Sequence, residues 1–271
     1  MATPQNSVDD ASPTVDDAPP VDSAIDYISS EDLKPLSEPD TQIQDLIEGL
    51  NSKDWVKVCE SLNDTRRLAL HHSTLLLPLL EPVMVVLVKA MKNPRSALCK
   101  TSIMAAGDIF AVYGDKLLEP TLSGGFDNLL LQLLLKSSQD KRFVCEEADK
   151  TLNTMVQSLT PLPLLHNLQK YARHFNPKVR AKAAISISSC VSRMNFEDLQ
   201  EFGLVSLVQV AANLLNDRLP EAREAARSIT MSVYKSFTEN EDQKQEAWQN
   251  FCESNLPALH GQSIIKITTT N

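Results

Sequence analysis

The chain has 271 residues, a net charge of −9, 42% hydrophobic residues, 7 glycines and 15 prolines. This length allows a sizeable hydrophobic core. Glycine lies well below its usual share of about 7%, which argues against β-rich folds and against glycine-rich loops that hold phosphates. The acidic total argues against a broad nucleic-acid footprint and against a polybasic membrane anchor.

The acidic charge is concentrated near the N-terminus. Residues 1–40 contain ten acidic residues and one basic residue, Lys34, so this segment accounts for the whole net charge and the remaining 231 residues are neutral. The segment also holds six prolines and few large apolar side chains. Such a composition cannot bury enough apolar area to offset the entropy lost on ordering. We therefore predict a disordered acidic tail over residues 1–40 and one folded domain over residues 41–271.

From Thr41 onward the apolar residues follow a helical period. In segment 176–194 they recur every three or four positions from Val179 to Met194, which gives one apolar stripe. Asn176 is a favourable N-cap and Pro177 suits the first helical position. This segment therefore predicts an amphipathic helix with a defined start.

Similar helix starts, each containing Asp or Asn, recur at positions 54, 93, 140, 176 and 216, at intervals of 39, 47, 36 and 40 residues. An apolar segment precedes each start: 43–50, 79–91, 126–135, 162–172 and 199–215. A period near 40 residues with two helices per unit is typical of HEAT and armadillo solenoids. We predict an all-α solenoid of about five helical hairpins plus a C-terminal cap.

In such a solenoid the turns inside successive hairpins line up along one edge, which we call the rim. The residues that the pattern places there are Trp55, Arg95, Lys141, Arg142, Lys178, Arg180, Arg218 and Arg223. A base in the first turn of a helix opposes the helix dipole by about 0.3–1 kcal/mol, so its recurrence favours a binding role over simple solvation. Two alternatives stay open: Arg180 and Arg223 could bond backbone carbonyls within a hairpin, and Trp55 could cover the core of the first repeat.

The run SKDWVKVCESLNDTRRL (52–68), with its Asp-Trp helix entry, resembles the first repeat of the TOG domain, a HEAT-like module, and is closest to the CLASP N-terminal type. Later segments are similar to the following repeats of that family: 93–114, 137–156, 176–188 and 219–237, with 247–259 similar to its capping repeat. The resemblance covers approximately residues 41–260, which is nearly the whole predicted domain.

The resemblance implies a flat array of repeats whose rim binds the αβ-tubulin heterodimer. Trp55 matches the first-turn tryptophan that makes a hydrophobic contact, and the rim bases match positions that meet acidic tubulin surface. Glu221 in the fifth turn departs from this pattern. We therefore expect a microtubule-associated protein of the cytoplasm and cytoskeleton that binds tubulin or microtubules and regulates microtubule dynamics or organisation. The alternative is a general HEAT or armadillo scaffold that binds a partner through its concave face.

Several other functions lack their usual signals. The sequence contains no GxxxxGK[ST], GxGxxG, HExxH or GxSxG motif, so we expect no enzymatic activity and no cofactor. We expect no nucleic-acid partner, because the body is neutral and its aromatic residues are not interleaved with bases. His71 and His72 could join Cys59 at a metal, but a helix C-terminal pair explains them better. We therefore expect no metal site.

The sequence also argues against a membrane or secretory setting. The apolar stretch from Leu75 to Val88 is interrupted by prolines and is shorter than the roughly 20 residues that span a bilayer. We expect a buried helix there and no membrane partner. The five cysteines are odd in number and form no CxxC pair, which fits a reducing compartment. The oligomeric state stays open.

Overall fold

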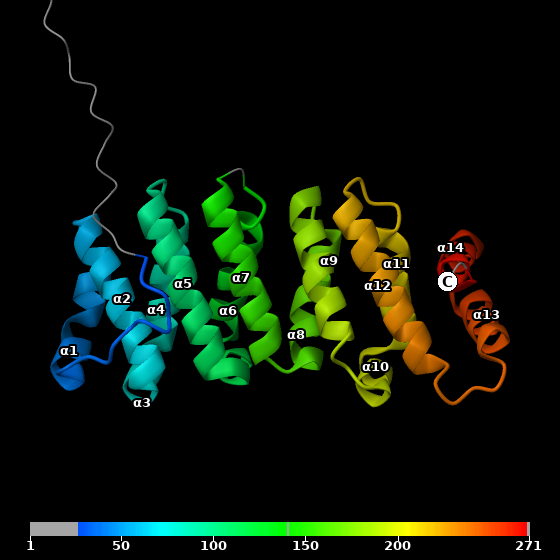
Figure 1. Ribbon diagram of the computed structural model, residues 1–271, viewed down its shortest axis with the longest axis horizontal. Helices are drawn as coiled ribbons and strands as arrows, with labels where there is room; N and C mark the ends of the chain where they lie inside the picture. Colours follow the sequence, from blue (N-terminus) through cyan, green and yellow to red (C-terminus); the bar gives the residue numbers. More distant parts are fainter. Residues whose placement is uncertain (1–26, 140, 270–271) are drawn as a thin grey trace, which may run out of the picture.

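A computed structural model of the chain describes residues 27–139 and 141–269. Its helical hairpins stand side by side in a row along the long axis (Figure 1). The first three hairpins are α1 (Pro39–Leu50) with α2 (Trp55–His71), α4 (Leu80–Met91) with α5 (Ser96–Tyr113), and α6 (Ser123–Lys136) with α7 (Arg142–Ser158). The next two are α8 (Pro161–Leu168) with α9 (Pro177–Val191), and α11 (Leu204–Leu214) with α12 (Pro220–Phe237). These hairpins confirm the predicted all-α solenoid, and no strand occurs within the described ranges.

Short helical pieces connect the hairpins. The first connection contains α3 (Ser73–Leu76) and the 3-10 helix η1 (Leu77–Leu79), and the second contains η2 (Gly114–Leu118). Later in the chain, η3 (Gln169–Arg173) extends α8 toward α9, and α10 (Phe196–Phe202) precedes α11. These pieces lie between or extend the long helices, so the two-helix repeat is preserved along the chain.

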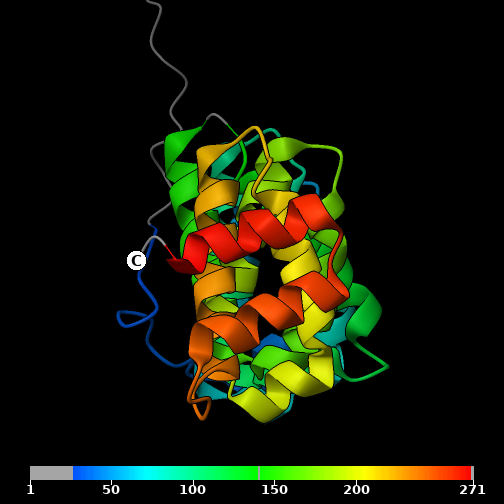
Figure 2. The ribbon, with the colours of Figure 1, turned by 90° about the vertical axis from the view of Figure 1, so that its right-hand side faces the viewer.

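The final pair, α13 (Lys244–Asn255) and α14 (Ala258–Thr269), crosses the end of the array in the view of Figure 2. Trp248 of α13 is fully buried, and its ring lies 5.5 Å from that of Tyr234 and 5.7 Å from that of Phe237. Aromatic burial of this kind closes the apolar end of the solenoid. The predicted C-terminal cap is therefore confirmed.

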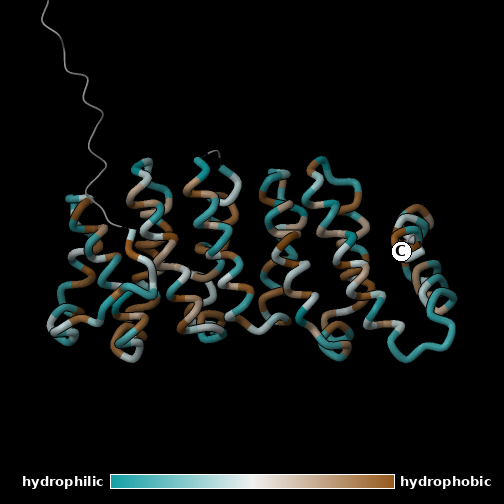
Figure 3. The backbone as a smooth tube through the Cα atoms, in the orientation of Figure 1, coloured by the Kyte–Doolittle hydropathy of each residue, from teal (hydrophilic) through white to brown (hydrophobic). Residues whose placement is uncertain are grey.

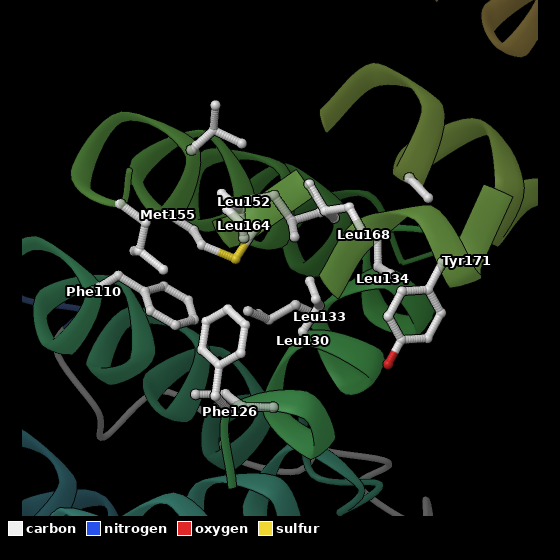
Figure 4. Packing of buried hydrophobic residues seen from close by; sticks show 14 of the residues in the cluster. Phe110, Phe126, Leu130, Leu133, Leu134, Leu152, Met155, Leu164, Leu168 and Tyr171 are labelled. Carbon is white, nitrogen blue, oxygen red and sulfur yellow. The ribbon is translucent and has the colours of Figure 1, made fainter. Parts of the chain in front are cut away.

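The hydrophobic core is continuous between the third and fourth hairpins. Leucines of α6 lie beside leucines of α8 in the close view of Figure 4. The rings of Phe110 and Phe126 meet edge to face, with centroids 6.0 Å apart. In Figure 3 hydrophobic stretches alternate with polar ones along the helices, while many of the turns at the upper edge are polar. Burial of one stripe per helix therefore leaves the turns to solvent.

The apolar stretch before the second rim turn is longer than the sequence suggested. The helical stretch Ser73–Met91 has 19 residues and is long and apolar enough to cross a membrane by length and composition alone. A core helix meets the same criteria, and 44% of an 18-residue window within this stretch is buried. Leu80, Met84 and Leu87 are completely buried in the solenoid core. The predicted buried helix is thus confirmed, and Pro78 is accommodated in η1.

The structure corrects the expected boundary of the disordered tail. Residues 27–38 lie against the body as an N-terminal strap, and α1 begins at Pro39 instead of after residue 40. Leu33 is buried, and its carbonyl oxygen lies 2.8 Å from Nε2 of His71. Sequence composition missed this because one buried leucine and backbone contacts hold the strap. Residues 1–26 lie outside the described residues.

A buried ion pair joins the strap to the first two hairpins. Nε of Arg66 on α2 lies 2.6 Å from a carboxylate oxygen of Asp108 on α5, and the two side chains are 1% and 7% exposed. The strap completes the pair, because Arg66 also donates to the carbonyl oxygen of Ile28, and Ser30 donates to Asp108. Each charged group is therefore satisfied on more than one side.

We expect Arg66→Ala to lower the free energy of unfolding by about 3–5 kcal/mol, because it leaves the Asp108 carboxylate buried without its cation. Chemical denaturation followed by circular dichroism measures this change. Arg67→Ala is the matched control, because Arg67 pairs with nearby Asp64 at a more exposed position, and its loss should cost under about 1 kcal/mol. Equal effects of the two substitutions on the free energy of unfolding would contradict a special role of the buried Arg66–Asp108 pair.

Candidate functional site

The rim consists of the turns that lead into α2, α5, α7, α9 and α12. The turns before α5, α7 and α12 lie along the upper edge of the array in Figure 1. Since each turn joins the two helices of one hairpin, the five turns occupy equivalent places in the repeat. The predicted alignment of the turns is therefore present in the structure.

The same type of hydrogen bond occurs in four of the rim turns. A side-chain oxygen of Asp or Asn accepts from the backbone N–H two residues later, at 2.9–3.0 Å: Asp54 to Val56, Asn93 to Arg95, Asn176 to Lys178 and Asp217 to Leu219. This bond satisfies a donor that the helix start leaves unpaired or fixes the turn just before it. Asp140, the corresponding residue before α7, lies outside the described residues. The shared bond explains why the sequence signals recur at each helix start.

Trp55 and Arg95 come together from the first and second turns. The Arg95 guanidinium carbon lies 5.1 Å from the centroid of the Trp55 ring, a cation–π contact. The ring is half-buried and packs against the core, so Trp55 both covers the first repeat and presents part of its surface. A hollow of about 120 Å³ beside it is lined partly by Lys53, Val86 and Lys89. The first two turns thus form one mixed aromatic and basic patch.

The third turn places two predicted bases in solvent. Nζ of Lys141 donates to Oγ of Ser96 at 2.9 Å, which links the third turn to the start of α5. Arg142 is exposed and pairs with Glu146 one turn along α7, at 2.7 Å. An exposed pair of this type contributes little to stability, so Arg142 is available for exchange with a partner.

Arg180, predicted as a contact residue of the fourth turn, has a structural role. Its guanidinium donates to Asp217 at 2.7 Å and to the carbonyl oxygens of His174 and Phe175. Arg180 therefore ties the fourth turn to the fifth. Lys178, the other predicted base of this turn, is exposed.

Arg223 has the same kind of role in the fifth turn. Its guanidinium donates to the carbonyl oxygens of Asp217 and Arg218 at 2.7 and 3.0 Å. The structural alternative that the sequence left open therefore holds for Arg180 and Arg223. Arg218 is exposed, as is Glu221 in the first turn of α12.

Sequence reasoning missed two exposed aromatic residues on the rim. Phe175 in the fourth turn is 88% exposed, and Phe143 at the start of α7 is 41% exposed. Both interrupt an otherwise polar turn, and an aromatic residue directly before the Asn-Pro cap at 176–177 was the available signal. A search of the turns for basic residues alone passed over both aromatic residues.

The histidines and cysteines do not gather into a metal site. Throughout residues 27–139 and 141–269, no group of three or more His, Cys, Asp or Glu residues could hold a metal ion. His71 contacts the strap, and Cys59 is buried.

Comparison with known proteins relates this geometry to one group. No family model matches the chain. The chain is 28% identical over 209 residues to TOG array regulator of axonemal microtubules protein 1 from Mus musculus, a match that covers 75% of this chain and 11% of that protein. The TOG domain of Zyg9 from C. elegans superposes with a TM-score of 0.60 at 17% identity, covering 90% of this chain and 91% of that one. The chain has a TOG-domain fold.

A second TOG structure agrees with this. It comes from work on TOG–tubulin binding specificity that promotes microtubule dynamics and mitotic spindle formation, and it superposes with a TM-score of 0.56 at 13% identity, covering 88% and 90% of the two chains. The resemblance to TOG domains seen in the sequence is confirmed. These relatives are named for microtubules or tubulin and not for an enzymatic activity. The chain spans about a tenth of the length of the curated relative, at 11%.

The ion pair of Arg180 with Asp217 predicts a pH dependence of stability. Burial raises the pKa of Asp217, but hydrogen bonds from Arg180 and from the Leu219 N–H outweigh it, so the folded-state pKa lies below the ordinary Asp value. A lowered pKa gives stability that is present above the unfolded-state pKa of about 3.9 and is lost as pH falls through the folded-state pKa.

We expect Asp217→Asn to lower the free energy of unfolding at pH 7 by about 1.5–3 kcal/mol, because Asn keeps the turn hydrogen bond but loses the ion pair. The difference from wild type should shrink below about pH 4. Urea denaturation across this pH range measures both. Asp54→Asn is the matched control, because it makes the same substitution in a turn with the same hydrogen bond, at an exposed position where Asp54 forms no ion pair within the described residues. A gap that stays constant with pH would exclude the charge pairing.

Proposed function

We propose that this TOG-type domain binds the αβ-tubulin heterodimer, free or in microtubules, through its rim. By that binding it regulates microtubule dynamics or organisation. It acts as a binding module of the cytoskeleton in the cytoplasm, without catalysis and without a cofactor. The contact residues are Trp55, Arg95, Lys141, Arg142, Lys178 and Arg218, while Arg180 and Arg223 position the turns.

One observation carries the proposal: a half-exposed tryptophan and exposed bases lie on equivalent turns of an otherwise neutral body. Trp55 and Arg95 form the patch at one end, and Lys141 links to the same strip through Ser96. Interfaces favour Trp and Arg as anchors. Bases on a narrow strip suit a partner with an acidic surface, since opposite charges speed and orient association.

The comparisons support this assignment of the partner. The curated relative is named as a regulator of axonemal microtubules, and one superposed TOG structure concerns TOG–tubulin binding. The order of the five rim turns is shared between the sequence resemblance and the observed fold. Together these points favour tubulin over an unrelated acidic protein.

The general scaffold alternative would use the face formed by the B helices. A groove of about 680 Å³ lies between α9 and α12 on that face. Small side chains such as Ser188, Ser189 and Ala225 line much of it, and no aromatic residue lines it. The groove therefore lacks an aromatic anchor of the kind that interface hot spots favour, whereas the rim has Trp55.

We expect Trp55→Ala to weaken tubulin binding about 30-fold, because truncating an aromatic hot spot costs at least about 2 kcal/mol. Lys141→Glu should weaken it about tenfold at low salt and less at high salt, because exposed charges are screened. Analytical ultracentrifugation with purified tubulin, supplemented by microtubule co-sedimentation, measures both.

Two control variants separate the rim from other surfaces. Lys150→Glu makes the same charge change at an exposed position further along α7. Ile185→Asp disrupts the groove on the face of the B helices, where Ile185 is exposed. Both should bind like wild type. Binding that survives the rim substitutions but is lost in Ile185→Asp would establish the scaffold alternative instead.

A further inference from the structure

Phe175 is the most exposed large hydrophobic side chain among the described residues, at 88%. It lies in the fourth rim turn, between η3 and α9. Single exposed hydrophobic residues are common on protein surfaces and by themselves indicate nothing. The inference depends on how the backbone around this residue is held.

The turn that carries Phe175 is fixed from several sides. One Arg180 nitrogen donates to the carbonyl oxygens of His174 and Phe175, at 2.8 and 3.2 Å. Arg180 is itself held by Asp217 of the next turn at 2.7 Å. On the other side, the N–H of Asn176 donates to Nδ1 of His174 at 3.2 Å. The ring of His174 also lies against the Phe175 ring, with centroids 4.4 Å apart.

A partly buried ion pair thus fixes the backbone from which an exposed aromatic ring projects. Side chains that are ordered before binding lose less entropy when a partner arrives, so a preorganised aromatic residue is an efficient anchor. Exposed bases lie near Phe175 in sequence: Arg173 ends η3 and Lys178 lies at the start of α9. Arg218 is exposed in the next rim turn. The fourth turn therefore repeats, further along the rim, the aromatic and basic combination of Trp55 and Arg95.

We propose that Phe175 is a second aromatic anchor for tubulin, entering an apolar depression bordered by acidic side chains. Arg180 and Asp217 are positioning residues that hold its turn. The proposal rests on the proposed function, since the occupant is the partner already assigned to the continuous rim. It adds a specific contact at the fourth turn, where the sequence predicted only bases.

Phe175→Ala should weaken tubulin binding about 30-fold, as expected for a hot-spot aromatic. The ring is uncharged, so the factor should be the same at low and high salt, in contrast to Lys141→Glu. Sedimentation-velocity titrations of the full chain at two salt concentrations measure this. Leu259→Ala is the matched control, because Leu259 is 79% exposed at the start of α14, away from the rim.

Arg180→Lys tests the positioning role, because it keeps the charge but loses the planar guanidinium that bonds Asp217 through Nε and the two carbonyl oxygens through a second nitrogen. We expect it to weaken binding, and the double variant with Phe175→Ala should bind no more weakly than Phe175→Ala alone. Thermal unfolding establishes that each variant is folded. Additive losses in the double variant would overturn the positioning role.

The outcomes separate the two proposals. If wild type binds tubulin and Phe175→Ala binds equally well, the second anchor is refuted and the proposed function stands. If wild type does not bind tubulin, the proposed function fails and the anchor fails with it. A loss in Phe175→Ala that disappears at high salt would also refute an apolar anchor.

Discussion

The hydrogen bond from an Asp or Asn side chain to the backbone two residues later is the constraint on which the rim depends. It occurs in the turns before α2, α5, α9 and α12, so each turn enters its second helix in a similar way. Because the hairpins stack in order, similar entries bring side chains of distant sequence onto one edge. A neutral body can then present a local basic strip with an aromatic residue at its end, without any change in overall charge.

The arginines near the rim divide into two groups, although the sequence gives them similar positions. Arg180 and Arg223 turn back onto carbonyl oxygens and are half-buried, whereas Arg142 and Arg218 extend into solvent. Arg180 and Arg223 each lie four residues after the N-cap of their helix, Asn176 and Leu219. One helical turn further on, the side chain points back over the turn that precedes the helix. The inward arginines thus hold the backbone of the turns, while the outward bases remain on the surface of the same edge.

The helix starts and the repeat could be predicted because they depend on local chemistry. Asp54 and Asn176 cap their helices as their residue types indicate, and the apolar stripes set the hairpins. The place of Phe175 directly before the Asn-Pro cap marks it as a turn residue but does not decide its exposure, since an aromatic residue beside a helix start is as compatible with a core as with a surface. The strap was missed for a related reason: its order comes from distant partners on α2 and α5, which composition does not register.

The strap stabilises a charged pair that is buried in the core of the first two hairpins. Arg66 and Asp108 are nearly inaccessible, and their mutual contact uses only part of the hydrogen-bonding capacity of each group. The carbonyl of Ile28 and the hydroxyl of Ser30 take up donors and acceptors that would otherwise be buried unpaired. The strap is therefore a structural part of the domain's first repeats, although it lies within the acidic segment 1–40. The strap also contacts the second hairpin at Tyr27, where Nζ of Lys100 on α5 lies 4.5 Å from the centroid of the Tyr27 ring.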